Sequence, residues 1–254
     1  MAPAAAQPAA VSVLYAGSLV TPMEGPIKAD LHRQGVDFQG EPGGSAKLAN
    51  FILAGVRSPD VFIAVDPTLL AKLGSRVASS TTFASTTLGV AWSPKSRYAP
   101  LFARVAAGAE SLAKALATPN LKIGRTDPRL DPKGRYTVAS MNAWLGTGPA
   151  VAILGVSENP AQIFPEEDLL ARVDTGEADV GFFYKTEAVA RGFPFVPLPP
   201  EAAAAARIEY ALAIMRDAPH PQQARTFANF VLRGAGRAIL ERAGLTYLTA
   251  AGNP

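Results

Sequence analysis

The chain has 254 residues, 48% of them hydrophobic, and its 24 Lys and Arg against 21 Asp and Glu give a net charge of +3. This length suits one large α/β domain or two lobes, and the positive excess is scattered, without the basic run that tracks phosphate backbones, so nucleic acid is not an expected partner. Because cysteine is absent and only two histidines occur, disulfides, thiolate or histidine metal sites and a Ser-His-Asp triad are not expected.

The N-terminal segment, residues 1–10, is rich in Ala, Pro and Gln. It lacks the charged region and the long apolar region of a signal peptide, and it resembles the start of a mature secreted chain with an added Met. A natural disordered tail is the alternative interpretation. No apolar run reaches membrane-spanning length. We therefore expect a periplasmic or otherwise extracytoplasmic protein whose signal peptide has been removed, with residues 1–10 disordered.

Residues 11–19 predict a short strand, a turn of small residues and then a helix. β-branched and aromatic residues dominate 11–15, and Ala16-Gly17-Ser18 ends the strand. Such a turn leaves backbone N–H groups free to bind an anion. The pattern recurs as a strand over 36–40, a turn over 41–45 and a helix over 46–53. Ser18 and Ser45 could therefore converge on one small anion, or they could be ordinary N-caps, which serine favours.

The first part of the chain continues with alternating strands and helices. A helix is predicted over 22–33, and the apolar run 61–65 is typical of a strand buried on both faces. A short helix ends near 73, so three βα units follow one another and predict a doubly wound lobe with ligands beyond the carboxyl ends of its strands. Residues 75–87 are dense in Ser and Thr, and the strand over 88–92 leaves this lobe.

The remaining elements predict a second α/β lobe inserted in the first. Their ranges are helices over 98–107, 110–117, 135–145 and 166–173, a strand over 121–124 that leads into a loop over 125–134, a strand over 178–184, a helix from 185, an extended link over 195–200, a strand over 208–215, and helices over 221–232 and 236–242. We expect two doubly wound lobes joined by hinge strands near 85–92 and 208–215. Lobe I would comprise 11–84 and 217–254, and lobe II would comprise 85–216.

Four motifs together resemble the molybdate/tungstate-binding proteins of ABC importers, which have the type II periplasmic binding protein fold. They are VLYAGSL at 13–19, GGSAK at 43–47, GRTDPRLDPKG at 124–134 and DTGEADVGFFYKT at 174–186. The resemblance covers nearly everything after residue 11. It implies a monomeric receptor without cofactor that closes on a tetrahedral oxyanion and delivers it to a membrane permease. A same-fold receptor for sulfate, phosphate or a small carboxylate is the alternative, and an enzyme is disfavoured because no nucleophile–base pair is visible.

The resemblance also implies which residues hold the oxyanion. Matched by motif, Ser18 and Ser45 would supply hydroxyl and N–H donors, and Tyr184 would donate its phenol. For Tyr184 the alternative is an aromatic ring that covers the core. Lys133 holds the position of a backbone N–H contact, with Gly134 beside it. Neutral donors at helix N-termini can hold an anion without a full cation.

The chain departs from one branch of this family, in which two carboxylates complete a six-oxygen coordination of the metal. Asp131 matches one of them, but Phe183 stands at the position of the other. We therefore expect at most one inward carboxylate, an apolar wall at Phe183 and a four-coordinate ligand. Asp131 would cap its own loop or pair with Lys133 or Arg135. These two cations would bring positive charge to the mouth of the site or point into solvent.

Overall fold

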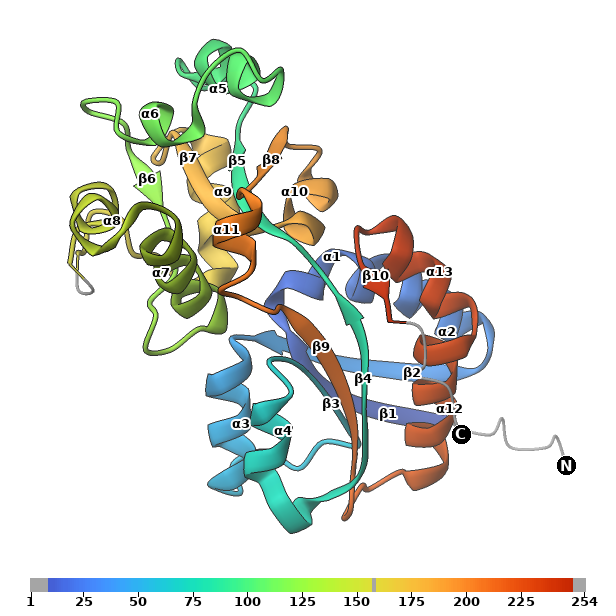
Figure 1. The fold of residues 1–254 in the computed structure, drawn as a ribbon. Coiled ribbons are helices and arrows are strands. Elements are labelled where there is room, and N and C mark those ends of the chain that lie inside the picture. The colour runs from blue at the N-terminus through green and yellow to red at the C-terminus, as the bar shows by residue number, and fades with distance from the viewer. Residues whose placement is uncertain (1–8, 157–158, 249–254) are drawn as a thin grey trace, which may run out of the picture.

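The computed structural model describes residues 9–156 and 159–248, which form two lobes, each built on its own sheet (Figure 1). The strand order is β10-β4-β9-β3-β1-β2 in the first lobe and β6-β7-β5-β8 in the second. The expected two-lobed α/β fold is thereby confirmed. The expected tail over 1–10 falls mostly outside the described residues, and β1 already begins at Ala9.

The first lobe holds the beginning and the end of the described chain. Its strands are β1 (Ala9–Ala16), β2 (Val36–Gly43), β3 (Val61–Val65), β4 (Val77–Ser85), β9 (Glu209–Met215) and β10 (Thr246–Tyr247). Its helical segments are η1 (Gly17–Leu19), α1 (Val20–Pro22), η2 (Met23–Ile27), α2 (Lys28–Arg33), α3 (Ser45–Leu53), α4 (Thr68–Leu73), η3 (Gly74–Arg76), α12 (Pro221–Arg233) and α13 (Ala235–Arg242).

The second lobe is a continuous stretch of chain. Its strands are β5 (Leu88–Trp92), β6 (Ile123–Gly124), β7 (Val180–Tyr184) and β8 (Phe195–Pro197). Its helices are α5 (Ala99–Ala106), α6 (Leu112–Leu116), α7 (Pro132–Leu145), α8 (Thr147–Leu154), α9 (Glu166–Thr175), α10 (Lys185–Arg191) and α11 (Pro200–Ala203). Among these, α8 and α11 were not predicted from the sequence.

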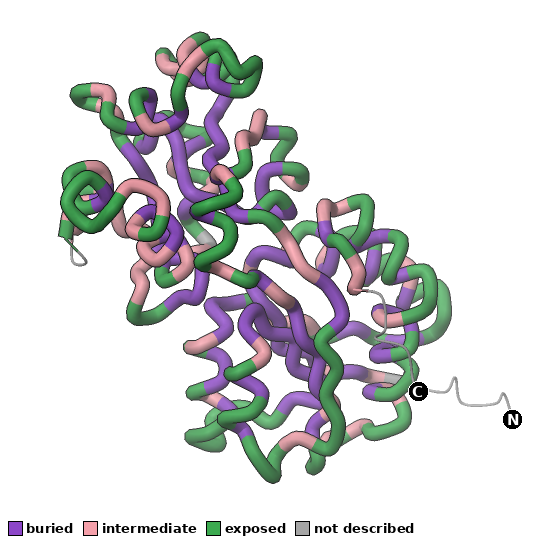
Figure 2. Tube along the Cα trace, in the orientation of Figure 1, coloured by how far each residue is buried: buried purple, intermediate pink, exposed green. Residues whose placement is uncertain are grey.

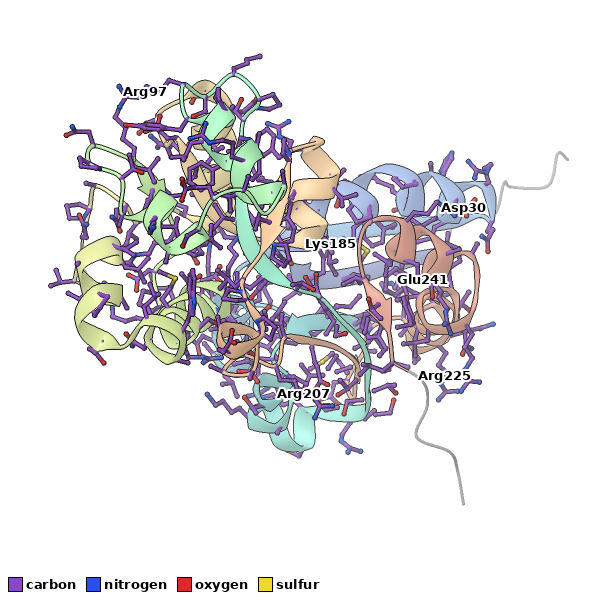
Figure 3. All side chains as sticks on the ribbon, turned by 45° about the horizontal axis from the view of Figure 1, so that its top comes forward. Asp30, Arg97, Lys185, Arg207, Arg225 and Glu241 are labelled. Carbon is purple, nitrogen blue, oxygen red and sulfur yellow. The ribbon has the colours of Figure 1, made fainter. Side chains whose placement is uncertain are left out.

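Apolar layers on both faces of the first sheet account for its continuous hydrophobic strands. All five residues of β3 are buried, as a strand covered on both faces requires. One face packs in a cluster that includes Phe227 of α12, and the other packs against Leu48 of α3 and Leu70 of α4. The burial map follows this layering, with buried strands inside and exposed helix surfaces outside (Figure 2). Most charged side chains, such as Arg97, Arg225 and Glu241, lie at the periphery (Figure 3).

The chain passes between the lobes twice, between β4 and β5 and again before β9 (Figure 1). Strand β9 pairs antiparallel with β3 and with β4, so residues 209–215 belong to the first sheet. The sequence analysis placed them in the second lobe, because an apolar strand carries no local sign of the sheet that it joins. We therefore divide the described chain into a first lobe of 9–85 and 209–248 and a second lobe between them.

Three local boundaries also differ from the sequence analysis. Strand β2 extends to Gly43, through most of the expected turn. The Ser- and Thr-rich stretch forms β4, which pairs with β9 along most of its length although most of its side chains are exposed. Helix α7 begins at Pro132 rather than at 135, since Asp131 caps it. Lys133 and Gly134 therefore lie in the first turn of a helix and not in a loop.

Candidate functional site

The two serine turns lie side by side at the carboxyl edge of the first sheet. Strands β1 and β2 are parallel, and Ala16 pairs with Gly43, so the turns that follow these residues are neighbours. Neither serine caps a helix with its side chain: the N-cap positions are Ala16 and Gly44, without side-chain cap hydrogen bonds. The interpretation of Ser18 and Ser45 as ordinary N-caps is therefore wrong.

Both serine hydroxyls are buried and bonded within their own lobe. The Ser18 Oγ lies 2.9 Å from the Tyr210 hydroxyl, and the Ser45 Oγ accepts a hydrogen bond from the Val65 N–H at 3.0 Å. A hydroxyl that accepts one bond still has its own O–H to donate. The Ser45 O–H therefore remains available to donate to a ligand. The Ser18 O–H is available in the same way when the Tyr210 hydroxyl donates to the Ser18 Oγ.

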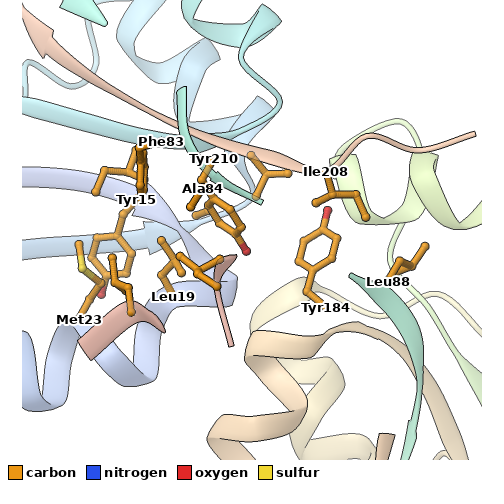
Figure 4. Close-up of a cluster of buried hydrophobic side chains, with 14 of the residues drawn as sticks. Tyr15, Leu19, Met23, Phe83, Ala84, Leu88, Tyr184, Ile208 and Tyr210 are labelled. Atoms are coloured by element: carbon orange, nitrogen blue, oxygen red, sulfur yellow. The ribbon is translucent and has the colours of Figure 1, made fainter. Parts of the chain in front are cut away.

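Tyr184 ends strand β7 on the side of the second lobe that faces the first. Its side chain is 1% exposed, and its hydroxyl has no hydrogen-bond partner among the described residues. Figure 4 shows the hydroxyl end directed towards Ile208, where the chain crosses between the lobes. Burial raises the pKa of this phenol well above its usual value, and the charges of Asp131 and Glu166 add to the shift. The neutral phenol is therefore a buried donor without an acceptor among the described residues, and its place between the lobes makes it a candidate ligand donor.

Asp131 caps helix α7, as one of the sequence expectations had it. Its Oδ1 accepts a hydrogen bond from the Lys133 N–H at 2.6 Å. The Lys133 N–H, which the motif assigns to the ligand, thus already donates a hydrogen bond to a side chain of the protein. Gly134 allows a close approach, because a Cβ there would lie 2.4 Å from the Thr126 carbonyl oxygen. This glycine packs the first turn of α7 onto the preceding loop.

Lys133 is fully buried, so the expectation that it stands at the mouth or in solvent is wrong. Its Nζ donates to Glu187 Oε1 at 2.6 Å and lies 4.0 Å from Glu166 Oε1. It also lies 5.5 Å and 5.7 Å from the ring centroids of Phe183 and Tyr184. Burial alone would lower the pKa of Lys133, but the surrounding carboxylates outweigh it and raise the pKa, so the ammonium form is kept.

The other residues singled out near this motif also have partners that the sequence did not indicate. Arg135 reaches across the lobe boundary, and its Nη2 lies 2.5 Å from Asp66 Oδ2 at the end of β3. Phe183 packs in a separate core cluster with Leu169 and Val173, on the opposite face of the sheet from Tyr184. It therefore forms no apolar wall of the site, because neighbouring residues of a strand point to opposite faces.

Sequence reasoning missed two carboxylates, Glu166 and Glu187. Glu187 Oε2 accepts from the Tyr184 N–H at 2.8 Å, and burial raises the pKa of this glutamate against the opposing effect of Lys133. Glu166 is the first residue of α9, directly after Pro165. The signal for Glu187 was its place three residues after a strand end, where a glutamate often bonds back to the backbone. Glu166 had no such local signal.

A cavity of about 390 Å³ opens between the lobes at this cluster. Its lining from the first lobe is Gly44 and Lys47, and its lining from the second lobe is Thr126, Asp127, Leu130, Asp131, Ile163, Phe164, Pro165 and Glu166. Its volume is within the range of small-molecule sites. Three carboxylate residues, Asp127, Asp131 and Glu166, line it, so the expectation of at most one inward carboxylate is wrong. Ser18, Ser45 and Tyr184 are not among its lining residues.

Two further properties concern the described residues as a whole. Over 9–156 and 159–248, no group of three or more His, Cys, Asp or Glu side chains is placed to hold a metal ion. Within the same ranges, no helix combines the length and the apolar character that crossing a membrane requires.

Comparison with known proteins identifies similar chains along almost the whole sequence. Residues 11–246 match the family described as bacterial extracellular solute-binding protein. A protein of Haloferax volcanii, named as an ABC transporter molybdenum-binding protein, is 33% identical over 189 residues. That match covers 74% of this chain and 59% of the relative, so this chain spans less than two thirds of the relative's length.

Two solved structures share the fold at low sequence identity. The periplasmic molybdate-binding protein of Azotobacter vinelandii superposes with a TM-score of 0.74 at 19% identity, covering 94% of this chain and 100% of that one. The sulfate-binding protein of Mycobacterium tuberculosis superposes with a TM-score of 0.71 at 16% identity, covering 95% and 88%. These likenesses establish the fold, and they include receptors for two different oxyanions.

Proposed function

Because the chain belongs to the family of bacterial extracellular solute-binding proteins, we propose that it is the receptor of an ABC importer for molybdate, with tungstate as the closest substitute. It would act outside the cytoplasm as a monomer, close its lobes on the oxyanion and present the loaded form to a membrane permease. The molybdenum-binding name of the Haloferax relative supports this ligand class. Membership of a receptor family agrees with the expectation that the chain is not an enzyme.

The observation that carries the proposal is the buried Tyr184 hydroxyl, which has no hydrogen-bond partner in the described part of the chain. It faces the lobe that supplies the Ser18 and Ser45 hydroxyls, each with capacity to donate to a ligand. Hydrogen bonds to a charged ligand contribute about 1.5–3 kcal/mol each. Donors fixed in place on two lobes would select an anion by size, because a smaller tetrahedron cannot reach both sets.

Sulfate and phosphate are the competing ligands, and the carboxylates that line the cavity favour phosphate of these two. Asp131 and Glu166 line the cavity, and a carboxylate can accept a hydrogen bond from an oxyanion that still carries a proton. The same two carboxylates could also add oxygens to the molybdenum, which would make the ion six-coordinate rather than four-coordinate. X-ray absorption at the molybdenum edge separates a four-coordinate from a six-coordinate ion.

A thermal-shift and calorimetric panel of molybdate, tungstate, sulfate, phosphate and arsenate tests the proposal. A ligand that binds only the folded state stabilises it by RT ln(1 + [L]/Kd), about 4 kcal/mol at a thousandfold excess over Kd. We expect the largest stabilisation with molybdate and tungstate. A response to sulfate or phosphate alone would reassign the ligand, and no response to any oxyanion would refute the proposal.

A further inference from the structure

The carboxylate of Glu166 reaches from the second lobe onto the first-lobe turn that carries Ser18. A Cβ added to Gly17 would lie 2.7 Å from Glu166 Oε2 and 3.0 Å from its Cδ. The carboxylate thus covers the backbone of Gly17 at a distance that only glycine allows, since any other residue would displace it. Helix α9 positions this contact, because Glu166 is its first residue and Pro165 precedes it.

The same carboxylate lies among the groups assigned to the ligand. Its Oε1 is 4.0 Å from the Lys133 ammonium, and its side chain is 7% exposed. Its charge contributes to the raised pKa of both Tyr184 and Tyr210, the second of which is bonded to Ser18. A negative charge of the protein therefore stands between the two lobes where the proposed oxyanion would enter. Two like charges this close in a water-poor site repel each other strongly.

We propose that Glu166 is an internal competitor of the oxyanion and thereby a specificity-determining residue. This inference rests on the proposed function. Its carboxylate occupies the Gly17–Ser18 turn, and a fully deprotonated dianion must displace it. An oxyanion that carries an O–H group can instead donate a hydrogen bond to the carboxylate and keep it in place. Glu166 therefore weakens the binding of molybdate and sulfate more than the binding of phosphate.

The substitution Glu166→Gln removes the charge and keeps the size of the side chain. The fold should tolerate it, because Lys133 keeps its closer partner Glu187 at 2.6 Å. Asp168→Asn is the matched control: Asp168 lies in the first turn of the same helix, is exposed, and loses the same charge. Urea unfolding of both variants establishes that each is folded before binding is compared.

Calorimetric titration with molybdate and with phosphate, under mildly alkaline conditions, measures the selectivity. We expect Glu166→Gln to bind molybdate about tenfold more tightly, to change phosphate binding less than about threefold, and Asp168→Asn to leave both unchanged. Unchanged or weaker molybdate binding in Glu166→Gln would overturn the inference, as would an equal gain for both anions. Where neither the natural protein nor the variant binds any oxyanion, the proposed function fails as well.

Discussion

The two lobes bring different chemistry to the boundary between them. The first lobe contributes short neutral side chains, Ser18 and Ser45, each bonded within its own sheet or turn. The second lobe contributes Asp131, Glu166, Glu187 and Lys133, which are charged and mostly buried. The first lobe thus offers donors that are held in place by its own fold. The second lobe holds a network of buried charges that sets the electrostatic potential at the site.

The largest expected effect comes from removing the buried cation Lys133 from that network, with Lys133→Met. It would leave Glu187 buried opposite no positive charge, and breaking a buried pair in this way costs about 3–5 kcal/mol. The free energy of unfolding from urea titration measures the loss. Lys185→Met is the control, because Lys185 is exposed and lies in α10, two residues before Glu187. A loss below about 1 kcal/mol in Lys133→Met would mean that the network does not stabilise the second lobe.

A second substitution, Tyr184→Phe, separates ligand binding from stability. The hydroxyl has no partner among the described residues, so its removal should change unfolding by less than about 0.5 kcal/mol. The loss of a bond to a charged ligand should weaken molybdate binding about ten- to a hundredfold. Calorimetry supplies the affinity. Unchanged binding would make Tyr184 an aromatic cover of the core, the alternative that its sequence position left open.

The serines of the first lobe should show a mixed response. Ser45→Ala leaves the buried Val65 N–H without its acceptor, so we expect a loss of about 1–3 kcal/mol in stability together with weaker oxyanion binding. Ser18→Ala should weaken oxyanion binding about ten- to a hundredfold, as expected for Tyr184→Phe. Ser80→Ala, on the exposed part of β4, is the control. Full affinity in both site variants would show that these hydroxyls serve the fold alone.

The smallest effect should come from the ion pair between Arg135 and Asp66, which spans the lobes. The Arg135 side chain is 49% exposed, and such pairs contribute at most about 1 kcal/mol. Arg135→Gln should therefore leave unfolding nearly unchanged but favour the open form, which small-angle scattering detects as a larger radius of gyration without ligand.

The control for this pair is Arg191→Gln. Arg191 is 45% exposed and pairs with Asp174 inside the second lobe. Saturating molybdate should reduce the radius of gyration of both variants if the lobes close by hinge bending. An identical radius in Arg135→Gln and Arg191→Gln would show that the Arg135–Asp66 pair does not influence closure.

The sequence predicted those parts of the molecule that depend on local patterns. The strand over 61–65 and the turn before Ser18 follow from residue type and periodicity, which act over a few positions. The partners of Lys133 could not be predicted in this way, because Glu166 and Glu187 are 33 and 54 positions away. Lysine is rarely buried unless paired, so a prediction from residue type alone places it in solvent.

The position of β9 in the first sheet also constrains the order in which the protein can fold. This strand lies between β3 and β4, yet the whole second lobe is synthesised before it. The second lobe can fold from a continuous stretch, whereas the first sheet stays incomplete until the last strands emerge from the ribosome. Non-local pairing of this kind is slow. Both tryptophans, Trp92 and Trp144, lie in the second lobe. Their fluorescence should therefore change when the second lobe folds and should not change when the first sheet is completed.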